Sequence, residues 1–287
     1  MSAQPAILKP QLGFARYLTA RRRLGVEAGA VRAALQAVEV DEQLVIGLGP
    51  GLCQLLGVER AETRCFPALS GPGVEVPSTQ ADLWIWVNRS APGSAVTQGL
   101  DVVRRLAIAF EFDAPVDGFQ NGETPNGLGR DLTGYEDGTE NPEGDAATEA
   151  AIASDGSSFV AVQTWRHDLA HFATHSQGER DDMIGRRESD NEELDEAPAS
   201  AHVKRTAQET FTPEAWVLRR SLPWAGPSGE GLMFVAFGHS FDAYEAQMRR
   251  MTGLDDGIVD ACFRFSRPTT GGYYWCPPLT DGRLQLG

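Results

Sequence analysis

The segment 134–142, GYEDGTENP, holds the residues whose types and spacing most strongly suggest chemistry. Glycine, aspartate, asparagine and proline crowd together here, which predicts a tightly turned loop. Gly134 and Gly138 would let the backbone adopt positive φ or approach a flat ligand closely. Asp137 can accept and release a proton if burial raises its pKa. From spacing alone, a functional loop and an ordinary turn are both open.

Two later segments offer complementary groups. The segment 201–205, AHVKR, contains His202, and a neutral imidazole nitrogen is a common iron ligand. The segment 217–224, VLRRSLPW, contains Arg219 and Arg220 side by side. If this stretch is a strand, only one of the two arginines faces a given side of it. An arginine supplies fixed positive charge to a developing anion, whereas a surface ion pair is the simplest expectation for Arg220.

Three other patterns have simpler interpretations. GLGPG at 47–51 lacks the sixth-position glycine of a dinucleotide loop and the lysine of a phosphate loop, so a turn after a strand is expected. His167, His171 and His175 are four residues apart, which on one helical face would suit a transition metal. A helix with partly exposed histidines is the alternative. The acidic run 188–196 predicts a solvated loop.

The elements that must position these residues alternate between strands and helices. Apolar runs predict strands at 43–48, 82–88, 158–166 and 215–221, and helical spacing predicts helices at 26–38 and 94–112. The order of 83–106 is repeated in 231–253: an apolar strand, a short polar turn, and a helix carrying an Arg-Arg pair. This repeat predicts two α+β units, residues 1–145 and 146–287, each a sheet with helices packed on it.

Composition excludes several classes of function. The 287 residues are 41% hydrophobic and 23% charged, which is typical of a globular protein able to bury a bulky cofactor. The formal net charge of −15 argues against binding to nucleic acid or anionic lipid. We expect no membrane span and no secretory signal, because no apolar run is long enough. The four cysteines form no CxxC pair, and reduced thiols in the cytoplasm are the simplest expectation.

Four segments, in order, resemble motifs of the dye-decolorizing peroxidases. Residues 134–142 resemble the GxxDG signature and its usual continuation, and AHVKR resembles the proximal-histidine motif. VLRRSLPW resembles the segment that supplies the distal arginine, and 231–245 the strand and helix that wall the haem. The segment 265–278 is also typical, so the likeness covers most of residues 130–280. The shortness of the chain favours the compact bacterial subgroup, class P or type B.

The resemblance implies a set of site residues. His202 would be the axial ligand of haem b iron, with Asp260 or Asp256 as the acceptor for its other ring nitrogen. Asp137 and Arg219 would handle hydrogen peroxide by proton transfer and by charge stabilisation. The family's distal arginine precedes a Ser or Asn by two residues, which places Ser221 in the same pocket.

Further expectations follow from the same likeness. The fold would be α+β, two ferredoxin-like domains with antiparallel sheets and peripheral helices, and the haem would lie in the C-terminal half. Arg205 and Asn141 are candidates to hold the haem propionates. Relatives form assemblies, so a homo-oligomer is expected.

The implied activity is reduction of hydrogen peroxide to water with one-electron oxidation of dyes or small aromatic reductants. Bulky dyes cannot reach a buried haem, so redox-active side chains near the surface could carry electrons; core aromatics are the alternative for each. The candidates are Trp165, Trp224, Tyr273, Tyr274 and Trp275. A haem-binding or haem-handling protein with incidental peroxidase activity is the rival function. It would need no distal acid.

Overall fold

One antiparallel sheet contains strands from both halves of the sequence. The computed structural model describes residues 1–58, 60, 62–122, 124 and 129–286. Within these ranges the strands of the sheet are β1 (Phe14–Arg22), β2 (Leu44–Leu48), β5 (Leu83–Arg89), β6 (Phe110–Phe112), β7 (Val116–Phe119), β8 (Ser158–His167), β9 (Leu218–Arg219), β10 (Leu222–Gly226), β11 (Gly229–Gly238), β12 (Ser266–Pro268) and β13 (Gly272–Cys276). Two separate hairpins pair β3 (Leu69–Gly71) with β4 (Val74–Val76) and β14 (Leu279–Thr280) with β15 (Arg283–Leu284).

Eight strands of the sheet close into a ring. Neighbours follow the order β8–β13–β2–β5–β1–β7–β10–β11, and β11 pairs with β8 again. The two halves of the sequence meet where Trp275 pairs with Leu48 and where Trp224 pairs with Gly118. Because side chains alternate along a strand, every second residue at the end of β8 points toward the same side. This alternation brings Gln163, Trp165 and His167 to one cavity.

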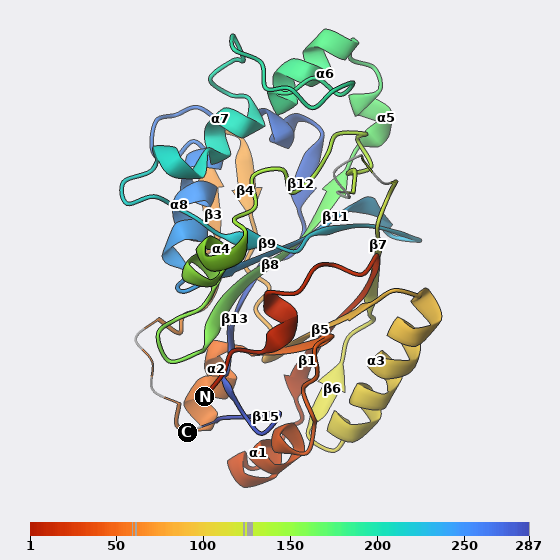
Figure 1. Ribbon diagram of the computed structural model, residues 1–287, viewed down its shortest axis with the longest axis vertical. Coiled ribbons are helices and arrows are strands. Elements are labelled where there is room, and N and C mark those ends of the chain that lie inside the picture. The colour runs from red at the N-terminus through yellow and green to blue at the C-terminus, as the bar shows by residue number, and fades with distance from the viewer. Residues whose placement is uncertain (59, 61, 123, 125–128, 287) are drawn as a thin grey trace.

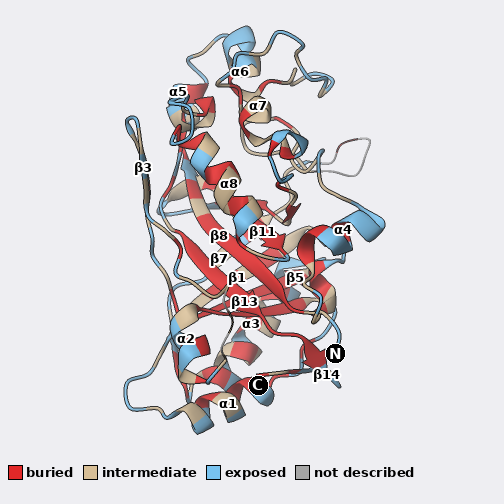
Figure 2. Cartoon of the chain, turned by 90° about the vertical axis from the view of Figure 1, so that its left-hand side faces the viewer, coloured by how far each residue is buried: buried red, intermediate tan, exposed pale blue. Residues whose placement is uncertain are grey.

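Helices lie on both ends of the sheet. They are α1 (Ala28–Gln36), α2 (Pro50–Leu55), α3 (Pro92–Leu106), α4 (Gly144–Ala151), α5 (Leu169–Phe172), α6 (Gln177–Ile184), α7 (His202–Thr206) and α8 (Asp242–Met251), with short 3-10 turns η1 (Pro5–Ile7), η2 (Gln208–Thr210) and η3 (Ala261–Arg264). Figure 1 shows α1, α2 and α3 with both chain ends at one end of the molecule, and α5, α6 and α7 at the other. In Figure 2 the buried strands β8, β11 and β13 run between these two ends.

Most predicted elements are confirmed, and two need correction. The strands predicted at 43–48, 82–88 and 158–166 are β2, β5 and β8, and the helix predicted at 26–38 is α1. The helix predicted at 94–112 ends at Leu106, because Phe110–Phe112 forms a strand that pairs with β1 and buries Phe110. The strand predicted at 215–221 is reduced to Leu218–Arg219, the residues that pair with β11.

The expected fold class is confirmed: the chain is α+β, with antiparallel sheets and peripheral helices. The repeated order of strand, turn and helix is present as β5–α3 and as β11–α8. The division into 1–145 and 146–287 stays a prediction. No helix among the described residues is both long and apolar enough to cross a membrane.

Candidate active site

A cavity in the C-terminal half, called here the inner cavity, collects most of the predicted site residues. One face of α8 lines it at helical spacing through Tyr244, Gln247, Met248 and Met251. Leu232 and Phe234 of β11 add apolar surface, as do Trp165, Ile184 and Phe265. The polar lining includes Asp131, Asp137, His167, His202 and Arg219. A cavity with apolar walls and a few convergent polar groups is the usual form of a cofactor site.

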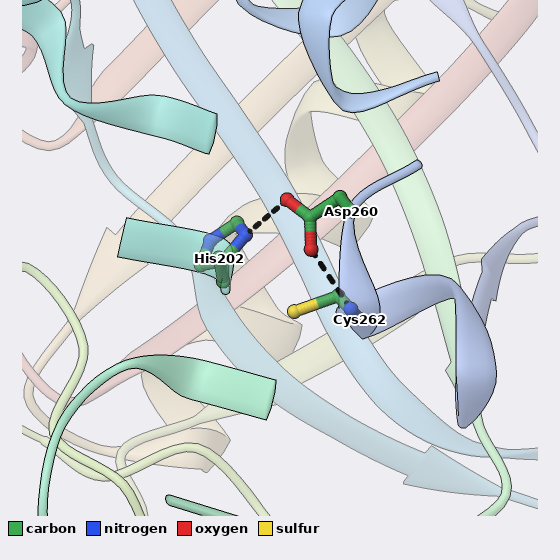
Figure 3. Close-up of side chains that lie close together, drawn as sticks. All are labelled: His202, Asp260 and Cys262. Atoms are coloured by element: carbon green, nitrogen blue, oxygen red, sulfur yellow. Dashed lines mark hydrogen bonds and ion pairs between the residues drawn. The ribbon is translucent and has the colours of Figure 1, made fainter. Parts of the chain in front are cut away.

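His202 is the first residue of α7, and its ring is held from one side. The Nδ1 atom lies 2.8 Å from Oδ2 of Asp260, whose side chain is fully buried. Figure 3 shows the two side chains facing each other, with Cys262 beside them. A carboxylate at Nδ1 fixes the tautomer and leaves Nε2 as a free, more basic ligand atom. The second carboxylate oxygen accepts from the backbone N–H of Cys262 at 2.8 Å, so Asp260 itself is locked at the start of η3.

The structure resolves the choice between Asp260 and Asp256. Asp256 accepts two hydrogen bonds of 2.7 Å from the guanidinium of Arg205, so it is occupied elsewhere. Arg205 is 5% exposed and also donates to the carbonyl of Arg250. It does not line the inner cavity, and contact of Arg205 with a haem propionate stays a prediction.

Asp137 lies in the predicted loop, between glycines that need positive φ. Gly134 has φ +96° and Gly138 has φ +90°, a region that only glycine adopts without strain. The carboxylate lines the inner cavity, and 26% of its side-chain surface is exposed. Burial raises the pKa of Asp137, and the nearby Asp131 adds to the rise, whereas Arg219 opposes it. A carboxyl with a raised pKa is suited to proton transfer.

Arg219, at the end of β9, places its Nη1 3.9 Å from Oδ1 of Asp137. This distance is too long for a hydrogen bond, so both groups keep hydrogen-bonding capacity for a small molecule. Asn141 holds the backbone of Arg219 on both sides, accepting from its N–H at 2.8 Å and donating to its carbonyl at 3.2 Å. Asn141 thus connects the loop to the strand, and its contact with a propionate stays a prediction.

Ser221 lies near Arg219 but does not line the inner cavity. Its hydroxyl accepts from the N–H of Val235 at 3.2 Å, and it lines a second cavity that Arg219 and Asp137 share. We expected Ser221 to share one pocket with Arg219. The two residues do line one cavity together, but it is the second cavity and not the inner one.

A second buried acid–base pair, which was not predicted from the sequence, lies in the inner cavity. Nε2 of His167 lies 3.1 Å from Oδ1 of Asp131, and Nδ1 lies 2.6 Å from the hydroxyl of Ser266. The pKa of Asp131 is lowered: burial raises it, but the hydrogen bond and charge of His167, with the hydrogen bonds from Thr133, outweigh that effect. The alternation along β8 was the available signal, since it places His167 on the face of Gln163 and Trp165.

The histidine series at 167, 171 and 175 does not form a metal site. His167 ends β8 and is buried, whereas His171 in α5 and His175 after it lie at the surface. Both earlier interpretations, one helical face and one histidine-bearing helix, are wrong because the strand ends between the first two rings. Among the described residues, His202, Asp260 and Cys262 form the group whose possible ligand atoms lie within 4.8 Å of one another. GLGPG spans the end of β2 and the start of α2 with only Gly49 between them, so the expected separate turn is replaced by a direct passage from strand to helix.

The aromatic candidates for surface electron transfer are all buried. Trp165 and Trp224 are 7% and 6% exposed, and Tyr273, Tyr274 and Trp275 are each 3% exposed or less. The prediction of positions near the surface is wrong, and the alternative of core aromatics is confirmed. Trp165 lines the inner cavity and donates to Gln163 at 3.1 Å.

The donor set of the inner cavity fits a flat iron cofactor. One imidazole presents a free nitrogen, and apolar side chains of α8 and β11 provide surfaces on which a macrocycle can pack. The amide Nε of Gln163 and the hydroxyl of Tyr244 are buried without hydrogen-bond partners among the described residues. Such orphaned groups are uncommon in native proteins and are accounted for where a ligand supplies their partners.

Comparisons with known proteins agree on one family. The family described as Dyp-type peroxidase, C-terminal, matches residues 129–281. The dye-decolorizing peroxidase of Rhodococcus erythropolis is 30% identical over 280 residues, which cover 85% of this chain and 81% of that protein. The dye-decolorizing peroxidase of Mycolicibacterium paratuberculosis is 29% identical over 235 residues, covering 78% of this chain. The match spans only 65% of that relative's length.

Solved structures give the same result. A DypB variant of Rhodococcus jostii RHA1, in complex with heme, superposes with a TM-score of 0.88 at 26% identity, over 99% of this chain and 98% of that one. A dye-decolorizing protein from V. cholerae superposes with a TM-score of 0.82 at 26% identity, over 95% of this chain and 96% of that one.

Proposed function

This chain belongs to the Dyp-type peroxidase family, and we propose that it is a haem peroxidase that reduces hydrogen peroxide to water and oxidises dyes or small aromatic reductants by one-electron steps. The observation that carries the proposal is the composition of the inner cavity. It combines a histidine anchored by a buried carboxylate with an acid of raised pKa beside an arginine. Neither feature alone distinguishes a catalyst from a cofactor carrier.

Haem b is the proposed cofactor, and His202 would hold its iron through Nε2. When bound, the haem iron supplies the redox chemistry that cleaves peroxide and accepts electrons from the reductant. Asp260 orients the imidazole and increases its basicity. Tyr244, Met248 and Met251 of α8 and Phe234 of β11 exclude water from the cavity.

Asp137 and Arg219 are the proposed residues that act on peroxide. The carboxylate takes a proton from one peroxide oxygen and delivers it to the other, directly or through a water. A raised pKa makes the protonated form stable enough to complete that transfer. The guanidinium of Arg219 stabilises the negative charge that develops as the O–O bond breaks. Ser221 is proposed to line the approach to Arg219 from the second cavity. Asn141 is proposed to fix the position of Arg219 through its backbone.

The proposal is tested on purified protein loaded with haem. Stoichiometric peroxide should change the Soret absorption band rapidly, and a phenolic reductant should restore it with one reductant oxidised per electron. Asp137→Ala should slow the change by about 10²–10⁴-fold, the usual contribution of a positioned acid–base group. A haem-handling protein, the rival function, would bind haem and show the same slow change with and without Asp137.

We also propose a homo-oligomer in the cytoplasm. The described cysteines Cys53, Cys65, Cys262 and Cys276 are all free thiols, which suits a reducing compartment. Leu24 and Ile108 are 98% and 77% exposed and flank the hydrogen bond from the N–H of Arg23 to the carbonyl of Ala109, so a contact between chains would cover both side chains together. Light scattering of the loaded protein tests the assembly, and a mass equal to one chain of 31.0 kDa would contradict it.

A further inference from the structure

A second cavity, called here the outer cavity, shares the Asp137–Arg219 pair with the inner cavity. It measures about 380 Å³, which is within the range of small-molecule sites. The N-terminal segment Leu8–Gln11, the loop residues Asn121 and Arg130, and β9–β10 all contribute to its walls. Asp137 and Arg219 line both cavities, so an occupant of the outer cavity lies next to the proposed redox site.

Arg220 lines the outer cavity and has no anionic partner among the described residues. It follows the last residue of β9, and it does not line the inner cavity, whereas the adjacent Arg219 lines both. No carboxylate of the described residues lies within the 4.0 Å limit of an ion pair with it, so the expected surface ion pair is wrong. Its Nη1 donates only to the carbonyl of Arg219 at 3.2 Å, and its Nε is buried without a partner.

The surroundings of Arg220 do not compensate its charge. Burial lowers the pKa of Arg220 to about 10, and no neighbouring carboxylate opposes that effect. A guanidinium presents a planar fork of donors that matches a carboxylate. An uncompensated, partly buried guanidinium is unfavourable until an anion enters, which makes it a recognition group rather than a structural one.

Two further features of the outer cavity favour an anion. The N-terminus of α4 lines it through Gly144, and the side chain of the N-cap residue Glu143 caps no N–H group of the helix. Arginines outnumber carboxylates among the lining residues: Arg130, Arg219 and Arg220 against Asp137 and Glu143. Arg130 is already engaged, because its Nη2 lies 3.6 Å from Glu136 and its Nη1 donates to the carbonyl of Gly134 at 2.7 Å.

We propose that the outer cavity binds an anionic reducing substrate, a small aromatic carboxylate, with Arg220 as its ionic partner. This inference rests on the proposed peroxidase function and names the class of its reductant. The carboxylate pairs with Arg220, and the aromatic ring lies toward Asp137 and Arg219, from where an electron has a short path to the cofactor.

The test uses haem-loaded protein, saturating peroxide, and two reductants with the same phenol: ferulate, which is anionic, and its uncharged methyl ester. Arg220→Gln should raise KM for ferulate about tenfold and leave kcat and the KM of the ester unchanged, as expected for loss of one charge-assisted hydrogen bond. Arg220→Lys should restore part of the difference, because it keeps the charge but loses the fork. Arg104→Gln, on the exposed face of α3, is the matched control and should change neither reductant.

An equilibrium measurement separates binding from turnover. Calorimetric titration of ferulate without peroxide should give a Kd about tenfold weaker for Arg220→Gln, and added salt should weaken ferulate but not the ester. Equal effects of Arg220→Gln on both reductants, or no effect on either, would overturn the inference. If the ester is oxidised with peroxide in those cases, the proposed peroxidase function stands; loss of turnover with both reductants in the unaltered protein would instead contradict that function.

Discussion

Two of the ionisable pairs at the inner cavity, His202–Asp260 and Asp137–Arg219, differ in how tightly they are built. His202 and Asp260 lie 2.8 Å apart, and the Asp260 side chain is fully buried with both oxygens accepting hydrogen bonds. Asp137 and Arg219 lie 3.9 Å apart, with 26% and 20% of their side-chain surfaces exposed. Both oxygens of Asp260 are thus engaged, whereas Asp137 and Arg219 make no hydrogen bond to each other and keep that capacity for another molecule.

This difference indicates different tasks. A cofactor ligand works best with a fixed direction and a fixed tautomer, which a short bond to a locked carboxylate provides. Groups that act on a small, passing molecule must leave room for it and must not be neutralised by each other. The two pairs should therefore respond differently to substitution.

A large effect on the peroxide reaction is expected at Arg219. Arg219→Leu should reduce the rate constant for the reaction of the loaded protein with peroxide by about 10²–10³-fold, as loss of one preorganised donor does. Stopped-flow absorbance measures this rate. The neighbouring variant Arg220→Gln is the control, since Arg220 does not line the inner cavity. A fall of similar size in both variants would show that general disruption of β9 is responsible.

The pH profile of the same reaction depends on Asp137. The free carboxylate must accept the peroxide proton, so the rate should rise as pH increases through the pKa of Asp137, which burial places above the ordinary value of an aspartate. Asp137→Asn should lower the rate and remove this acid limb. An unchanged limb in the variant would assign the ionisation to another group, with the neighbouring Asp131 as the first candidate.

A smaller effect is expected at the other pair. Asp260→Ala should weaken haem retention about 10–100-fold, the usual cost of removing the partner of a histidine ligand. Competition for haem with a second haem-binding protein measures this. Asp256→Ala is the matched control, because Asp256 pairs with Arg205 instead of His202. Equal losses in both variants would mean that the loop 254–260, and not the bond to His202, supports the cofactor.

The smallest effect is on stability. The raised pKa of Asp137 means that the folded protein holds its proton more tightly than the unfolded chain does. This contribution to stability is complete below the unfolded pKa and is lost as pH rises through the folded pKa. At neutral pH, Asp137→Asn should therefore stabilise the haem-free protein, on the order of 1 kcal/mol, as relief of a strained functional site does. The difference should vanish in acid; urea unfolding at both pH values measures it.

Much of the site was predictable because its residues stand in short, ordered motifs. The loop around Asp137, the pair Arg219 and Arg220, and His202 could be placed from the resemblance alone. The choice of Asp260 over Asp256 could not, since it depends on where Arg205 points. The His167–Asp131 pair joins residues 36 positions apart, and only the register of β8 brings them together.

The fold was predictable where local pattern and tertiary packing agree. The strand that became β8 has a strong apolar pattern, and it forms as expected. The overlong helix at 94–112 shows the limit: the apolar residues after Leu106 fit a helical pattern, but pairing with β1 recruits Phe110–Phe112 into the sheet. The short β9 has the same cause, since its extent is set by its partner β11.

The central claim is that the imidazole of His202 binds the haem iron. The direct measurement is the haem content and Soret absorbance of His202→Ala beside His175→Ala, a partly exposed histidine outside both cavities. We predict that His175→Ala keeps a full complement of haem, whereas His202→Ala loses the haem or the spectrum of a histidine-ligated iron. A His202→Ala protein that retains the wild-type spectrum and turnover would contradict the account.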